Sequence, residues 1–231
     1  VDLRRLMDGE YVAARDYQSF RYLVDLREPK DLSGYAHASW TNGFDGVLML
    51  DDLLPQYGGG TRRLSGRMDV RLPAGWSIHS SDAPELRSSD LSRSVVFIGK
   101  GYRTVDSRSA HGDLKLLLNG EWHFTDDEAS QMAREIFDEY SKMFGRLPMQ
   151  RYLVALHRFP SQEQQPGRWE AETRGRTVSI FSSDMPFRTQ SLQRLHEQLR
   201  HEIFHLWFPN GIDLAGDYAW FYEGFAVYSS L

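Results

Sequence analysis

The chain has 231 residues, 41% of them hydrophobic and 26% charged, so it can bury the core of one large or two small domains. Its net charge of −5 argues against nucleic acid or an anionic membrane as a partner. The sequence contains no cysteine, which excludes disulfides, cysteine zinc sites and thiol catalysis. Any metal must therefore be held by His, Asp or Glu side chains.

No run of about 18 apolar residues occurs, so the sequence predicts no membrane-spanning helix. A chain without cysteine suits reducing and oxidising surroundings alike. A cytoplasmic, periplasmic or secreted location, and every oligomeric state, therefore remain open.

The first part of the chain, residues 1–112, reads as a β-rich domain. Short apolar or alternating runs separated by glycine-, proline- and serine-rich turns predict strands at 21–26, 46–50, 68–72 and 94–99. A second domain is expected over residues 113–231, beginning with the apolar run 113–118.

The second part of the chain alternates helices and strands. Thr125 followed by Glu128 is a capping-box pattern, and apolar residues at fourfold spacing then predict a helix that ends at Gly145. Strands are expected at 152–157 and at 176–181, the latter at an edge of its sheet. The fold class predicted from these elements is α+β.

The next helix is expected to begin near Thr189 or Ser191 and to carry the pattern His-Glu-x-x-His. A step of four residues advances a helix by about one turn, so His201 and His205 point the same way. They face away from the apolar stripe of this helix, formed by Leu192, Leu195, Leu199, Ile203 and Leu206. Two neutral imidazoles so placed are a ligand pair for Zn²⁺, and Glu202 beside them is a candidate general base. The alternative is an exposed polar face with two unrelated histidines.

A hydrolytic zinc site needs a third protein ligand and an open fourth position. Glu223 follows His205 by seventeen residues, within an aromatic and helix-compatible run. An acid on a mostly buried helix is costly unless it is paired or metal-bound, so Glu223 is the predicted third ligand. The alternative is a solvated surface acid. Asp217 is predicted to cap this helix or to hydrogen-bond a ligand histidine.

The stretches HEIFHLWFPN (201–210) and WFYEGFAVY (220–228) resemble the signature of gluzincin zinc aminopeptidases. The similarity is to the glycyl aminopeptidase family and the alanyl/leucyl aminopeptidase-like family, and it extends diffusely through 70–76 and 123–160. It implies a β-sandwich-like N-terminal domain followed by a thermolysin-like catalytic domain. It also implies one Zn²⁺ per chain held by His201, His205 and Glu223. Glu202 would then activate water against a peptide or protein substrate.

The chain departs from these families where the substrate binds. The segment around Glu172 lacks the families' glycine-rich edge motif. Glu172 is a candidate for the acid that binds a substrate's free amine, and the alternative is a charged exposed loop. Ser230 replaces a further acid, and the chain ends eight residues after Glu223, so we expect a fragment without the C-terminal helical domain. An endopeptidase and a non-catalytic binding or scaffold module therefore stay open beside an aminopeptidase.

Overall fold

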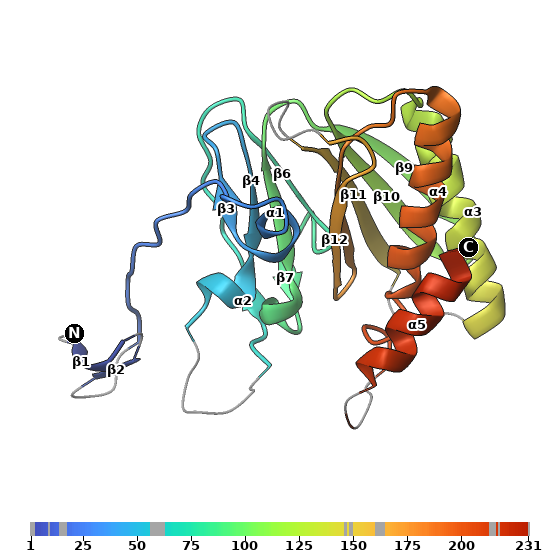
Figure 1. Ribbon diagram of the computed structural model, residues 1–231. Helices are drawn as coiled ribbons and strands as arrows, with labels where there is room; N and C mark the ends of the chain where they lie inside the picture. The colour runs from blue at the N-terminus through green and yellow to red at the C-terminus, as the bar shows by residue number, and fades with distance from the viewer. Residues whose placement is uncertain are drawn as a thin grey trace.

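The computed structural model describes residues 3–8, 10–13, 18–55, 63–145, 147, 150–159, 165–212, 216 and 218–230. Its fold is mixed α+β and has three layers, as Figure 1 shows: a four-stranded sheet, a five-stranded sheet and a layer of helices. No described helix is long and apolar enough to cross a membrane.

The five-stranded sheet is the central layer, with the strand order β12-β13-β11-β10-β9. Its three inner strands are parallel to one another, and the two outer strands are antiparallel to their neighbours. The strands are β9 (Arg103–Ser109), β10 (Gly112–Asn119), β11 (Arg151–Arg158), β12 (Trp169–Arg174) and β13 (Thr177–Ser182). Strand β12 is thus an edge strand.

The four-stranded sheet is antiparallel throughout, with the order β3-β4-β8-β6. Its strands are β3 (Trp40–Thr41), β4 (Asp45–Met49), β6 (Ser77–Ser80) and β8 (Val95–Gly99). Around it lie α1 (Gly34–His37), α2 (Leu50–Leu53), the 3-10 helix η1 (Leu91–Arg93) and the pair β5 (Gly66–Arg67) and β7 (Arg87–Ser88). The hairpin of β1 (Leu3–Met7) and β2 (Glu10–Ala13) stands apart in Figure 1.

The helix layer consists of α3 (Asp126–Phe144), α4 (Arg188–Phe204) and α5 (Ala219–Ser230). The central sheet lies between the helices and the four-stranded sheet, so both of its faces are buried. Because side chains alternate across a strand, each strand contributes residues to both faces. On β10, Leu114, Leu116 and Leu118 join the core under the helices, whereas Leu117 joins the core under the four-stranded sheet. One sheet therefore separates two apolar cores.

Several predicted elements are confirmed. The predicted strands at 46–50, 94–99 and 152–157 correspond to β4, β8 and β11, and the helix after Thr125 is α3 with both capping-box hydrogen bonds. The strand at 176–181 is β13, but it lies inside the sheet because β12 covers its outer side.

Two predicted strands are wrong. Residues 21–26 form no secondary structure, and the apolar Tyr22, Leu23 and Val24 are exposed. Residues 68–72 form no strand, although the backbone N–H of Met68, just after β5, donates to the carbonyl oxygen of Leu86. A strand needs a partner whose position a local pattern does not encode, which explains both errors.

The predicted boundary at residues 112 and 113 falls at the start of β10, which forms a hairpin with β9. The division into two domains remains a prediction. Within residues 1–112 a single four-stranded sheet is present in the described part, and its packing partner is the five-stranded sheet. The β-sandwich-like N-terminal domain likewise remains a prediction.

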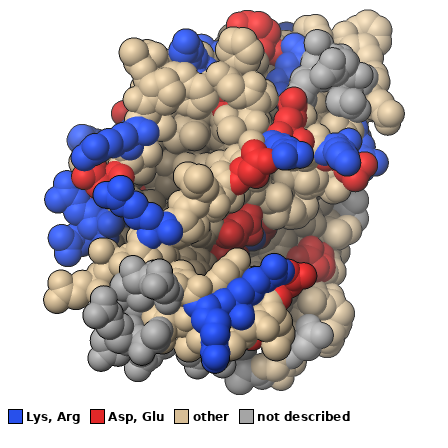
Figure 2. All heavy atoms as spheres, turned by 90° about the vertical axis from the view of Figure 1, so that its left-hand side faces the viewer, with Lys and Arg blue, Asp and Glu red and all other residues tan. Residues whose placement is uncertain are grey.

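Figure 2 shows the molecule from the left-hand side of Figure 1. Basic side chains gather along one edge of this face, and acidic side chains lie near its hollowed centre. Both signs of charge are present and neither covers the face.

Candidate metal centre

Helix α4 presents the two histidines of the motif. Its apolar residues Leu195, Leu199 and Ile203 are buried in the core under the helices, which fixes the rotation of the helix about its axis. The last helical residue is Phe204, and His205 follows as the C-cap with φ −65° and ψ −11°. These angles are still helical, so His205 keeps its one-turn relation to His201.

Helix α5 brings Glu223 to the histidines. It is attached to α4 by Arg200, whose Nε donates to the carbonyl oxygen of Ser229 at 2.6 Å, and by the stacking of Phe225 on Phe204. Helix α5 is mostly exposed, and the prediction that Glu223 sits on a mostly buried helix is wrong. Ala226 is the buried residue of α5, and the Glu223 side chain is 54% exposed. Most aromatic side chains of α5 are exposed as well, so they do not bury this acid.

The three predicted ligands nevertheless lie together. The Nε2 atoms of His201 and His205 are 3.3 Å apart, and Glu223 Oε2 lies 3.5 Å from the first and 3.6 Å from the second. A tetrahedral zinc site with bonds of about 2.0–2.2 Å separates neighbouring ligand atoms by roughly 3.3–3.6 Å. The donor set and its spacing therefore fit a zinc ion with one open position.

The histidine environments suit neutral, ligating imidazoles. The Nδ1 atom of His205 lies 2.8 Å from the carbonyl oxygen of Phe208. A carbonyl only accepts, so Nδ1 carries the hydrogen and Nε2 offers its lone pair toward His201 and Glu223. Burial, and secondarily the nearby His205, lower the pKa of His201, although Glu223 acts in the opposite direction. The lowered pKa of His201 favours its neutral, ligating form.

Glu202 lies between the two histidines in sequence and is buried, with 4% of its surface exposed. Burial raises the pKa of Glu202 to about 8, and the negative charges of Glu223 and Glu172 add to that effect. The hydroxyl of Thr173, 2.8 Å from Glu202 Oε2, acts in the opposite direction. A buried acid with a raised pKa beside a metal-ligand cluster can take up and release a proton.

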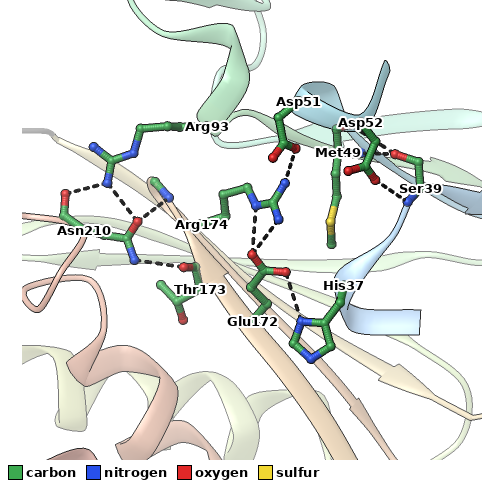
Figure 3. A network of polar contacts seen from close by, with 11 residues as sticks. His37, Ser39, Met49, Asp51, Asp52, Arg93, Glu172, Thr173, Arg174 and Asn210 are labelled. Atoms are coloured by element: carbon green, nitrogen blue, oxygen red, sulfur yellow. Dashed lines mark hydrogen bonds and ion pairs between the residues drawn. The ribbon is translucent and has the colours of Figure 1, made fainter. Parts of the chain in front are cut away.

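Glu172 lies on β12 but does not present a free carboxylate. Successive residues of a strand point to opposite faces, and Thr173 is the residue that contacts Glu202. Glu172 instead accepts hydrogen bonds from Nε and Nη2 of Arg174 at 2.9 and 2.7 Å, and its other oxygen lies 3.1 Å from His37 Nδ1 (Figure 3). Arg174 also pairs with Asp51 of α2. The assignment of Glu172 as an amine-binding acid remains a prediction.

Three residues of the site were missed by sequence reasoning: Thr173, Asn210 and Arg93. Asn210 stands at the end of the motif stretch and joins Thr173 to the end of α4, while Arg93 reaches it from η1 (Figure 3). Thr173 directly follows Glu172 in the segment expected to bind substrate, so its position in the sequence could have suggested it. Arg93 carries no local signal, because it lies 117 positions from its partner in the chain. The cap predicted at Asp217 falls outside the described residues.

A cavity of about 820 Å³ lies beside this network and is lined by Arg93, Arg176, Gly175 and Asn210 among others. The metal-ligand cluster does not line it. The candidate centre is therefore described by its converging side chains.

The sequence matches no protein-family model and no curated protein. Among solved structures, the fold is similar to that of an aminopeptidase N family protein from Idiomarina loihiensis, with a TM-score of 0.67 and 16% sequence identity. The match covers 87% of this chain and 38% of that protein, so this chain spans well under half of its length. At this identity the likeness concerns the fold alone.

Proposed function

We propose that this chain carries the zinc centre of a peptidase and hydrolyses peptide bonds with His201, His205 and Glu223 as ligands. The observation that carries the proposal is the spacing of the three ligand atoms, which matches the edges of a tetrahedral zinc site. The fold likeness to an aminopeptidase N family protein supports it, and a thermolysin-like catalytic domain after an N-terminal β domain belongs to the same proposal.

Zinc bound there would act as a Lewis acid that polarises a carbonyl group and lowers the pKa of water. Glu202 is the general base: it takes a proton from the attacking water and delivers it to the leaving amine. The carboxylate is oriented for this by Thr173. Strand β12 lies at an edge of the sheet, and an extended peptide can lie along such an edge.

The substitution Glu202→Gln tests the base. It should retain zinc and lower the turnover of peptide substrates by about 1,000-fold, since general acid–base catalysis contributes roughly 10²–10⁴-fold. Glu197→Gln, the same change on the same helix, is the matched control and should keep full activity. Unchanged turnover in Glu202→Gln would remove Glu202 from the mechanism. A zinc-loaded wild-type chain that cleaves no peptide would instead favour the binding or scaffold module.

The aminopeptidase type is favoured by the fold likeness, but one observation favours an endopeptidase. The carboxylate of Glu172 is occupied by Arg174 and His37, so it does not stand ready for a substrate ammonium group. Peptides with free and with acetylated N-termini separate the two activities. Cleavage of free peptides alone supports the aminopeptidase, and equal cleavage of both supports the endopeptidase.

A further inference from the structure

The side chain of Asn210 joins three separate segments of the chain. Its Nδ2 donates to the carbonyl oxygens of Thr173 on β12 and His205 at the end of α4, at 2.8 and 3.1 Å. Its Oδ1 accepts from the backbone N–H of Gly175, which follows β12, and from Nη2 of Arg93, both at 2.8 Å. All four hydrogen bonds that an amide side chain can make are therefore formed.

These partners also fix the orientation of the amide. If the oxygen and nitrogen of Asn210 were exchanged, the amide nitrogen would face the donors of Gly175 and Arg93, and the oxygen would face two carbonyl oxygens. The network thus permits one orientation only. Arg93 Nη2 further donates to the backbone carbonyl of Asn210 at 2.9 Å, which holds main chain and side chain together.

Gly175 shows that the contact with η1 is close. It has φ +59°, and a Cβ atom there would lie 2.8 Å from the carbonyl oxygen of Arg93. Only glycine avoids both the backbone strain and this clash. The turn between β12 and β13 therefore packs directly against η1, which belongs to the N-terminal part of the chain.

Two groups of the metal centre depend on the positions that Asn210 fixes. The backbone of Thr173 is held by Asn210, while its hydroxyl lies 2.8 Å from Glu202 Oε2. The carbonyl of His205 is held by the same amide nitrogen and also by the backbone N–H of Asn210 at 3.3 Å. One side chain thus links the edge strand, the candidate base and a candidate ligand.

We propose that Asn210, itself held by Arg93, is a positioning residue that sets the edge strand against the end of α4 and so orients Glu202 and His205. The kinetic part of this inference rests on the proposed function, whereas the part that concerns His205 does not. Because Arg93 holds Asn210, the N-terminal part of the chain becomes a structural component of the centre.

Asn210→Asp is the test, because aspartate has the same shape, keeps the acceptor for Gly175 and Arg93, and loses both donors. We expect a zinc Kd about 10-fold higher than wild type, as removal of outer partners of metal ligands weakens binding roughly 10–100-fold. We also expect kcat to fall about 10-fold with little change in KM, since Glu202 acts in the transition state. Asn42→Asp is the matched control: within the described part of the chain, the Asn42 side chain accepts through Oδ1 from Phe44 and Asp45 and donates to no group, so this variant should behave as wild type.

Arg93→Ala is a second variant that tests the proposal even if Asn210→Asp does not fold. It should raise the zinc Kd and lower kcat by about threefold each. A folded Asn210→Asp protein with wild-type zinc Kd and kcat would overturn the proposal. A raised zinc Kd without peptide cleavage by wild type would reject the proposed function and keep the positioning role. If wild type takes up no zinc, the imidazole NMR signals of His205 decide: unchanged signals in both variants overturn the proposal.

Discussion

At the scale of single residues, the candidate centre combines exposed and buried acids. Glu223 is 54% exposed and can be reached by a metal from solvent, whereas Glu202 is buried against Thr173. A buried carboxylate without a hydrogen-bond partner costs several kcal/mol or takes up a proton. The Thr173 hydroxyl therefore orients Glu202 and also stabilises its ionised form.

Thr173→Val removes this hydroxyl and keeps the shape of the side chain. We expect kcat for peptide cleavage to fall about 10-fold, because Glu202 loses its orienting hydrogen bond. Zinc content should stay at the wild-type level, since the Thr173 hydroxyl hydrogen-bonds Glu202 and, among the described residues, none of the three ligands. Steady-state kinetics and metal analysis check both points. Thr104→Val on β9 is the control, and equal kcat values in the two variants would contradict the role of Thr173.

At the scale of elements, α3 is the helix whose limits follow most directly from local sequence. The Thr125 Oγ1 accepts from the backbone N–H of Glu128, and the Glu128 carboxylate accepts from the backbone N–H of Thr125. The hydrogen bonds lie within four residues, so a local pattern contains all the information needed. Strand β12 is the opposite case: its charged residues read as a loop, and pairing with β13 makes it a strand.

The contribution of the α3 cap to the free energy of unfolding should be measurable. Thr125→Ala leaves the backbone N–H of Glu128 without its partner and should lower the free energy of unfolding by about 1 kcal/mol. Urea denaturation gives this value, and Thr125→Ser, which keeps a hydroxyl, should recover most of it. An alanine variant as stable as wild type would show that the cap contributes nothing.

At the scale of the whole molecule, the packing of the two sheets encloses a histidine. His157 on β11 stacks between Phe97 and Phe181, with ring centroids 5.3 and 4.7 Å away. Its Nε2 is buried and has no hydrogen-bond partner among the described residues. Burial, and secondarily the charge of His79, lower the pKa of His157 to about 3.

This histidine should make the protein sensitive to acid. Between pH 6.5 and 3 the unfolded chain protonates His157 while the folded chain keeps it neutral, so stability falls as the pH falls. At pH 4 the penalty amounts to about 3 kcal/mol relative to neutral pH. His157→Phe should remove this part of the pH dependence, which urea denaturation at several pH values would reveal. Identical pH slopes in both proteins would contradict the buried, neutral state.

The limits of prediction from sequence follow from the same distinction between local and distant contacts. The helical period places His201 beside His205, and the structure brings both to Glu223. The aromatic setting that suggested Glu223, however, is largely exposed. The contacts of Thr173 and Asn210 depend on how β12, α4 and η1 meet in space. No pattern within one element encodes such a junction.

Metal binding by the wild-type chain and a Glu223→Ala variant tests the central claim most directly. After removal of metal, addition of zinc and dialysis, elemental analysis should find one zinc ion per wild-type chain. Glu223→Ala should bind zinc at least about 10-fold more weakly, since it retains two of three ligands. A wild-type chain that takes up no stoichiometric zinc, or a variant with unchanged affinity, would contradict the assignment of His201, His205 and Glu223 as a zinc centre.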